Sequence, residues 1–244
     1  MNTIQVVHGE LNGGEKTMLY SPLGEKEFQV QFHEIFEEGH YKSGRIKRDM
    51  NILDVGGNCG LASLYLKDWA KKIVAFEPNF FHFEALRQNI APYSHLRAIN
   101  KAVLYADGME FMSSGTSPFA ESFMATGGVK QLVSCITMEQ ALKEAEMDHV
   151  DLLKIDIEGS EYGLFVSESF EKCVPKIDHI VGELHFEQKM VPELGIGLLE
   201  KYGYEVKVIP SKNIFLGVYL DLADGTRDRS FEKHFDTIFF AKRK

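Results

Sequence analysis

Residues 51–60 read NILDVGGNCG, and this stretch decides the fold because it joins a short apolar strand to a glycine-rich turn. The strand ends in Asp54, and a helix is predicted from Leu61 onward. Four residues of the turn tolerate unusual backbone angles or let a ligand approach closely: Gly56, Gly57, Asn58 and Gly60. Unpaired N–H groups at the start of the helix would face the same point. The unit therefore predicts a ligand-binding turn.

A second acidic residue ends the next predicted strand. Residues 72–77 form a mostly apolar run that finishes in Glu77. In strand–turn–helix–strand units of this length, a carboxylate at that position accepts hydrogen bonds from ribose hydroxyls. The combination predicts binding of an adenosine-containing cofactor.

The spacing within the turn distinguishes between cofactors. It fits acid-x-G-x-x-x-G, with Asp54, Gly56 and Gly60, and fits neither the dinucleotide pattern G-x-G-x-x-G nor the P-loop. Neither Lys nor Arg occurs between Met50 and Lys67, so no side-chain cation is at hand for a phosphate. S-adenosylmethionine, a sulfonium cation without phosphates, is therefore the predicted cofactor. An NAD-dependent oxidoreductase and a non-catalytic nucleoside-binding module are the alternatives from other classes.

Composition limits the compartment and the partners. The 244 residues suffice for one α/β core, and a formal net charge of −9 argues against a surface that tracks nucleic-acid phosphates. Three widely separated cysteines indicate neither a disulfide framework nor a zinc site. The first residues lack a signal-peptide core, and no apolar run is long enough to span a membrane. We therefore expect a cytoplasmic protein without nucleic-acid or membrane partners.

The alternation of apolar patterns predicts a Rossmann-like α/β fold with seven strands, mostly parallel. Strands are predicted at residues 51–55, 72–77, 96–103, 150–156, 177–185, 204–209 and about 235–241. Helices are predicted at residues 61–70, 80–91, 137–146, 161–171 and 191–202. The last strand follows a polar loop instead of a helix, so we expect it to run antiparallel.

Two segments interrupt this rhythm. Residues 1–50 contain turn signals between short strands and a predicted helix at 31–39, so they read as an N-terminal cap on a domain formed by residues 51–244. Residues 113–128 are polar and glycine-rich and read as a long loop, a feature that is usually either functional or disordered.

A second chemical cluster lies in residues 150–161, VDLLKIDIEGSE. Lys154, Asp156 and Glu158 alternate along one face, at the end of a strand expected beside the one that carries Asp54. Asp156 would then line the cofactor crevice, or form a buried pair with Lys154. Glu161 would either bind the ligand or complement a helix N-terminus.

The following strand ends in Glu183 and His185, which are two residues apart and share a face. A histidine there suits a general base, because its unperturbed pKa lies close to working pH. Asp156, Glu183 and His185 could alternatively hold a divalent metal such as Mg²⁺. A hydrogen-bonded histidine at a strand end is the structural alternative.

Residues 52–90, 133–142 and 151–161 together resemble the FkbM family of S-adenosylmethionine-dependent methyltransferases. The resemblance rests on D-x-G-x-N-x-G followed by L-K-I-D-x-E-G-x-E, and Glu183-Leu184-His185 is similar to the acid–apolar–His strand end that often follows. It implies O-methylation of a small molecule or a sugar hydroxyl. One departure from the family is the run at residues 135–138, CITM, where T-L-D is commoner.

Residue roles carry over by the same match. Gly56, Asn58 and Gly60 would contact the methionine part of the cofactor and Glu77 the ribose, with Asp156 near the reacting methyl. Our hypothesis is that His185 or Asp156 accepts the acceptor's proton, while Glu158 and Glu183 orient the base or the acceptor. Methylation of an amine, on a small molecule or a protein, is the alternative because a carboxylate can assist an amine too.

Overall fold

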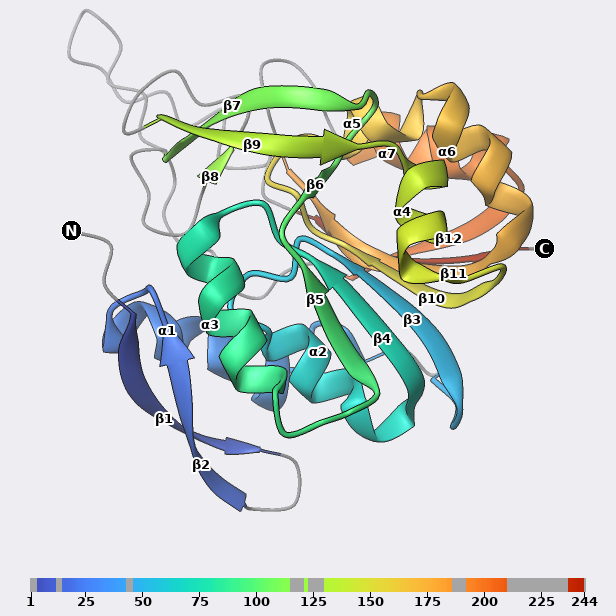
Figure 1. Ribbon diagram of the computed structural model, residues 1–244. Coiled ribbons are helices and arrows are strands. Elements are labelled where there is room, and N and C mark those ends of the chain that lie inside the picture. Colours follow the sequence, from blue (N-terminus) through green and yellow to red (C-terminus); the bar gives the residue numbers. More distant parts are fainter. Residues whose placement is uncertain are drawn as a thin grey trace, which may run out of the picture.

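The computed structural model describes residues 4–11, 15–42, 46–114, 121–122, 130–185, 192–209 and 237–243. Its centre is a seven-stranded sheet with helices on both faces (Figure 1). Among the described residues, no helix is both long and apolar enough to cross a membrane. The predicted α/β class is confirmed.

Seven strands form the main sheet in the order β12-β13-β11-β10-β3-β4-β5. Their bounds in that order are Tyr204–Ile209, Thr237–Arg243, Ile177–Leu184, Val150–Ile155, Met50–Val55, Ala70–Phe76 and Leu96–Ile99. Strand β13 runs antiparallel to both neighbours, and the pairs from β11 through β5 are parallel. The predicted antiparallel last strand is confirmed, and β10 lies beside β3 as expected.

Helices cover both faces of this sheet. Those packed on one face are α2 (Leu61–Leu66) and α3 (Phe80–Ile90), and those on the other are α4 (Met138–Ala145), α5 (Glu161–Phe165), α6 (Glu168–Cys173) and α7 (Pro192–Lys201). Short 3-10 turns follow α2 and α6, at Lys67–Trp69 and Val174–Lys176.

The single helix predicted at residues 161–171 is wrong, because it is two helices. Val166 ends α5, and the side chain of Ser167 accepts a hydrogen bond from the Phe170 amide to start α6. A serine with extended backbone at such a point caps a new helix more readily than it continues an old one.

A second, four-stranded sheet is the main departure from the prediction. It contains β6 (Ala102–Val103), β7 (Gly108–Ser114), β8 (Glu121–Ser122) and β9 (Lys130–Ile136) in the order β6-β9-β7-β8. The predicted strand at 96–103 is divided between the two sheets. Strand β7 reads GMEFMSS, and its apolar residues Met109 and Phe111 are exposed. Most of the predicted loop at 113–128 lies outside the described residues.

The N-terminal residues pack on the α2 and α3 face. Strands β1 (Gln5–Leu11) and β2 (Glu15–Ser21) form an antiparallel hairpin, followed by α1 (Glu25–Phe32) and a π-helical turn, η1 (His33–Glu37). The helix predicted at 31–39 therefore begins earlier. Phe28 of α1 shares one hydrophobic cluster with α2 residues. The domain division at residue 50 stays a prediction.

Successive side chains of β3 point to opposite faces of the sheet and so belong to two different hydrophobic clusters. Ile52 belongs to the cluster beneath α2, while Leu53 and Val55 belong to the cluster beneath α4 to α6. Asp54 and Lys154 follow the same alternation as Ile52 and Leu152 on their strands, so both charged side chains enter the α2 face. These two buried charges lie directly beneath the glycine turn of the candidate site.

Candidate functional site

The glycine turn has the strained geometry that its sequence indicates. Gly56, Asn58 and Gly60 all have positive φ, at 87°, 47° and 94°. A Cβ on Gly56 would lie 1.8 Å from the Asp156 carbonyl oxygen, which no side chain could accommodate. Gly57 instead packs under α3, where a Cβ would lie 3.0 Å from a Leu86 methyl carbon. Glycine at position 56 therefore lets the ends of β3 and β10 meet.

Asp54 lies behind the turn and is fully buried. Its Oδ2 accepts a hydrogen bond of 2.7 Å from the Ser63 hydroxyl, and its Oδ1 lies 3.3 Å from Lys154 Nζ. Lys154 also donates to the Gly56 carbonyl oxygen at 2.5 Å. The structure thus places Asp54 as a buried support for the turn, outside the residues that line the pocket.

Glu77 joins the turn to the start of α3. Its Oε2 accepts a 2.8 Å hydrogen bond from the Asn58 amide, and its Oε1 accepts one of 2.8 Å from the Asn79 amide. His82, which the sequence gave no reason to select, contacts the Asn58 side-chain oxygen through Nδ1 at 2.8 Å. Burial lowers the pKa of His82 to about 4, so its ring is neutral near pH 7.

A pocket opens at the carboxyl edge of the sheet beside this turn. Its lining is Gly56, Asn58, Phe76, Glu77, Pro78, His82, Ala102, Val103, Leu104, Met112, Asp156, Ile157 and Glu158. None of these described lining residues is Lys or Arg, so the pocket offers no side-chain cation to a diphosphate. Apolar walls for an adenine, Glu77 for a ribose and two carboxylates for a sulfonium fit S-adenosylmethionine.

The second predicted cluster converges at the same edge. His185 Nε2 lies 3.7 Å from Asp156 Oδ1 and 3.4 Å from Glu158 Oε2. Its Nδ1 lies 3.0 Å from Oε1 of the fully buried Glu161. Because an ionised carboxylate can only accept, this contact places the proton of a neutral ring on Nδ1 and directs Nε2 toward Asp156 and Glu158. The structure thus places His185 beside Asp156 and Glu158, and its catalytic role stays a prediction.

Glu161, the first residue of α5, binds both the histidine and the backbone of the preceding turn. Besides contacting His185, its two oxygens accept hydrogen bonds from the Ile157 amide at 2.9 Å and the Gly159 amide at 3.0 Å. The same carboxylate closes the acidic turn and orients the imidazole. Glu158 sits in that turn with φ of 52°. Burial raises the pKa of Glu158 well above its ordinary value of 4.5.

The metal trio predicted from sequence is not the one that converges. Donor atoms of Asp156, Glu158 and His185 lie within 4.8 Å of one another, so Glu158 takes the position expected for Glu183. Glu183 is not part of this group, and its Oε1 lies 3.8 Å from Nδ1 of His40 in the N-terminal segment. The reason is that Glu158 leaves the strand in a left-handed turn that brings its carboxylate back to His185.

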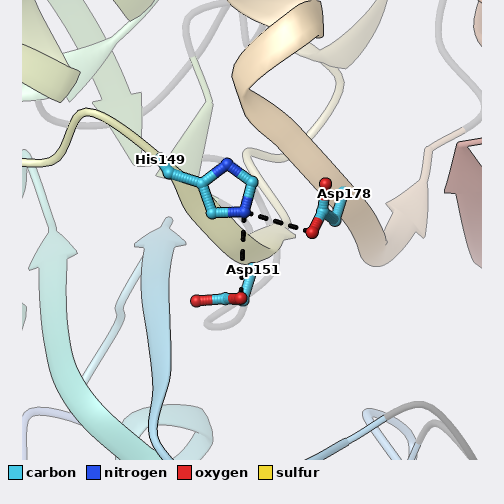
Figure 2. A group of neighbouring side chains, drawn as sticks. All are labelled: His149, Asp151 and Asp178. Atoms are coloured by element: carbon cyan, nitrogen blue, oxygen red, sulfur yellow. Dashed lines mark hydrogen bonds and ion pairs between the residues drawn. The ribbon is translucent and has the colours of Figure 1, made fainter.

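A second group of metal-ligand type lies at the opposite end of β10 and β11 (Figure 2). His149 Nε2 lies 3.1 Å from Asp178 Oδ2 and 3.8 Å from Asp151 Oδ1. Asp151 also accepts a 2.8 Å hydrogen bond from the Asn51 amide, and Asp178 lies 3.5 Å from the Arg243 guanidinium. These contacts tie β3, β10, β11 and β13 together, which is a structural role.

Comparison with known proteins places this site in a family. The model of the Methyltransferase FkbM domain matches residues 54–206, a range that holds both the glycine turn and the His185 cluster. Methyltransferase sdnD of Sordaria araneosa is 26% identical over 228 residues, and the match covers 77% of this chain and 86% of that protein.

Solved structures support the fold. Magnesium protoporphyrin IX methyltransferase of Synechocystis PCC 6803, solved with bound SAM, superposes with a TM-score of 0.51 at 8% identity, covering 90% of this chain and 83% of that one. A methyltransferase from a complex with the Haloferax volcanii Trm112 activator gives 0.50 at 10% identity, covering 89% and 91%. Both resemblances concern the arrangement of strands and helices alone.

Proposed function

The chain belongs to the FkbM methyltransferase family and is an S-adenosylmethionine-dependent methyltransferase, and we propose that it methylates a hydroxyl of a small molecule or sugar. One observation carries the proposal. The buried Glu161 carboxylate holds His185 so that Nε2 faces Asp156 and Glu158 at the mouth of the cofactor pocket. A hydroxyl needs a base at such a point, because it is a weak nucleophile while protonated.

The residues of the glycine turn and the pocket position the cofactor in this proposal. S-adenosylmethionine supplies the sulfonium-bound methyl group when it is bound. In our proposal Gly56, Gly57, Asn58 and Gly60 cradle its methionine part, Glu77 receives the ribose hydroxyls, and Asp156 lies near the methyl. Holding two reactants in line can contribute on the order of 7–11 kcal/mol to lowering a barrier.

His185 accepts the proton in this proposal. Its Nε2 takes the hydrogen of the acceptor hydroxyl while Nδ1–H stays bonded to Glu161, so the imidazolium that forms lies between carboxylates. Glu161 has no exposed surface, which keeps that stabilising charge out of water. General-base assistance of this kind contributes roughly 10²–10⁴ in rate.

The carboxylates at the mouth favour one class of acceptor. Asp156 and Glu158 line the pocket and are each partly exposed, and carboxylate oxygens accept hydrogen bonds from hydroxyl and ammonium donors. Such a wall binds hydroxyl or ammonium donors and repels anions. We therefore propose that the acceptor presents hydroxyls to the site and carries no carboxylate or phosphate close to the methylated position.

Two measurements test the proposal. Thermal melting with S-adenosylmethionine, its demethylated product or NAD separates the cofactors, because a ligand at 100 times its Kd adds about 2.7 kcal/mol. A screen of neutral hydroxyl acceptors and their amine analogues, followed by detection of S-adenosylhomocysteine, then separates O- from N-methylation. Stabilisation by NAD alone, or turnover only with amines, would refute the proposed activity.

Repeating the screen with Mg²⁺ and with a chelator decides how the hydroxyl is deprotonated. Turnover that survives the chelator supports His185 as the base. Turnover that requires added metal would instead assign Asp156, Glu158 and His185 to a divalent cation, since their donor atoms lie within 4.8 Å of one another.

A further inference from the structure

The N-terminal segment reaches the candidate site through a rigidly held turn. Phe32 and Phe36 stack with ring centroids 4.4 Å apart, and Phe36 meets the Tyr65 ring of α2 edge-on at 5.5 Å. The chain then reverses at Gly39, whose φ is 69°. This anchoring directs His40 and Tyr41 toward the carboxyl ends of β10 and β11. Two residues outside the family match, which begins at residue 54, thereby contact side chains of the candidate site.

Tyr41 is the deepest of these contacts, with only 3% of its surface exposed. Its hydroxyl donates a 3.0 Å hydrogen bond to Asp156 Oδ2, across 115 positions of sequence. The Tyr41 ring also lies 5.4 Å below Lys154 Nζ in a cation–π contact. Burial raises the pKa of the phenol well above 10, so Tyr41 remains a hydrogen-bond donor and is no base.

His40 makes a parallel contact with the next strand. Its Nε2 lies 3.2 Å from Glu38 Oε2, and its Nδ1 lies 3.8 Å from Glu183 Oε1. Burial lowers the pKa of His40, but the carboxylates of Glu183, Glu34 and Glu38 outweigh it and the pKa is raised above 6.5. The segment therefore donates a hydrogen bond to Asp156 and places His40 within ion-pair distance of Glu183.

We propose that Tyr41 is a positioning residue that holds Asp156 in the orientation that favours the cationic methyl donor over its neutral product. This inference rests on the proposed function, which puts Asp156 near the sulfonium. With Oδ2 held by Tyr41, Oδ1 lies 3.7 Å from His185 Nε2, and Asp156 is among the residues that line the pocket. Without the phenol, Lys154 Nζ, which lies 3.8 Å from Oδ2, can draw the carboxylate back toward Asp54.

The test is the ratio of two affinities measured by calorimetry on the full chain. Tyr41→Phe should weaken S-adenosylmethionine binding about tenfold while changing S-adenosylhomocysteine binding by less than about twofold. The matched control is Tyr204→Phe, because Tyr204 is equally buried and its hydroxyl donates to the Ile177 carbonyl oxygen at 3.0 Å, away from the pocket. That control should leave the ratio unchanged.

A double-mutant cycle covers the case in which Tyr41→Phe disturbs the fold. In an Asp156→Asn background, Tyr41→Phe should have no further effect on the ratio, because the carboxylate it positions is gone. Equal losses for both ligands, or an unchanged ratio in a variant that melts normally, would overturn the role of Tyr41. Absence of S-adenosylmethionine binding to the unaltered protein would instead refute the proposed function.

Discussion

Lys154 Nζ lies 3.3 Å from Asp54 Oδ1 across two adjacent parallel strands, and neither side chain is more than 3% exposed. The two residues are direct register partners of β10 and β3. Asp54 Oδ1 accepts no hydrogen bond among the described residues, so the ammonium is what compensates its charge. Lys154 also holds the Gly56 carbonyl oxygen, and the pair therefore supports the glycine turn from beneath.

Removing this ammonium should be costly. Lys154→Met leaves Asp54 charged and buried, and we expect a loss of about 3–5 kcal/mol in the free energy of unfolding, measured by urea denaturation. Adding Asp54→Asn to the Lys154→Met variant should restore part of the lost stability. Lys172→Met is the control, since Lys172 is 53% exposed and its pairing with Glu168 is worth little. Equal stability of the Lys154 variant would contradict the role of the ammonium in compensating the Asp54 charge.

Gly56→Ala should disrupt the turn and with it cofactor binding. The positive φ is unfavourable for alanine, and the new methyl would meet the Asp156 backbone, which cannot rotate away. We expect a loss of roughly 2–4 kcal/mol together with loss of S-adenosylmethionine binding in thermal melts. Gly197→Ala in α7 is the matched control, because open space surrounds it and helix propensity favours alanine. An intact ligand-induced shift in the Gly56 variant would refute the role of this turn.

His185→Gln should abolish most turnover without disturbing the cofactor. Loss of the base predicts a fall in kcat of roughly 10²–10⁴, with the Kd for S-adenosylmethionine within about twofold of that of the unaltered protein. His179→Gln changes a histidine of the same strand whose Nδ1 contacts the Asp151 carbonyl oxygen, and it should retain normal kcat. Near-normal turnover of the His185 variant would exclude it as the base.

Glu158→Gln should stabilise the protein at neutral pH. Burial raises the folded-state pKa of Glu158 above 4.5, so the folded chain holds the proton longer, and stability falls as pH rises from about 4.5 through the raised pKa. The neutral amide removes that loss, and we expect a gain of about 1 kcal/mol near pH 7 and little near pH 4. Glu168→Gln should give no such gain, because a hydrogen bond from Lys172 lowers the pKa of Glu168. A Glu158 variant less stable at pH 7 would contradict this.

His40→Gln should lower the stability of the protein at mildly acidic pH and have little effect at alkaline pH. The pKa of folded His40 is raised above 6.5, so its contribution is fully present below about pH 6.5 and is lost as pH rises through the folded-state value. The variant should therefore lose stability at pH 6 and approach the unaltered protein at about pH 9, in urea titrations at both values. A constant difference across that range would show that the His40–Glu183 contact is not ionic.

Local sequence was sufficient to predict those features of the site that depend on backbone conformation or strand order. Positive φ at Gly56 and Gly60 follows from residue type, and the neighbouring positions of β3 and β10 follow from the alternation of strands and helices. The placement of His185 at the carboxyl edge followed in the same way. The small sheet around β7 was missed because the apolar–polar alternation at Met109, Glu110 and Phe111 is too short to indicate a strand by itself.

Side-chain partners between distant elements were decided only by the tertiary structure. Glu158, instead of Glu183, joins Asp156 and His185 because a left-handed turn redirects its carboxylate. Tyr41 reaches Asp156 because aromatic packing on α2 fixes the N-terminal segment over the strand ends. The sequence by itself determined the conformation of the glycine turn, since local backbone preferences act within a few residues. Tertiary packing decided which carboxylate each donor contacts, because these contacts depend on the relative positions of elements that are distant in the sequence.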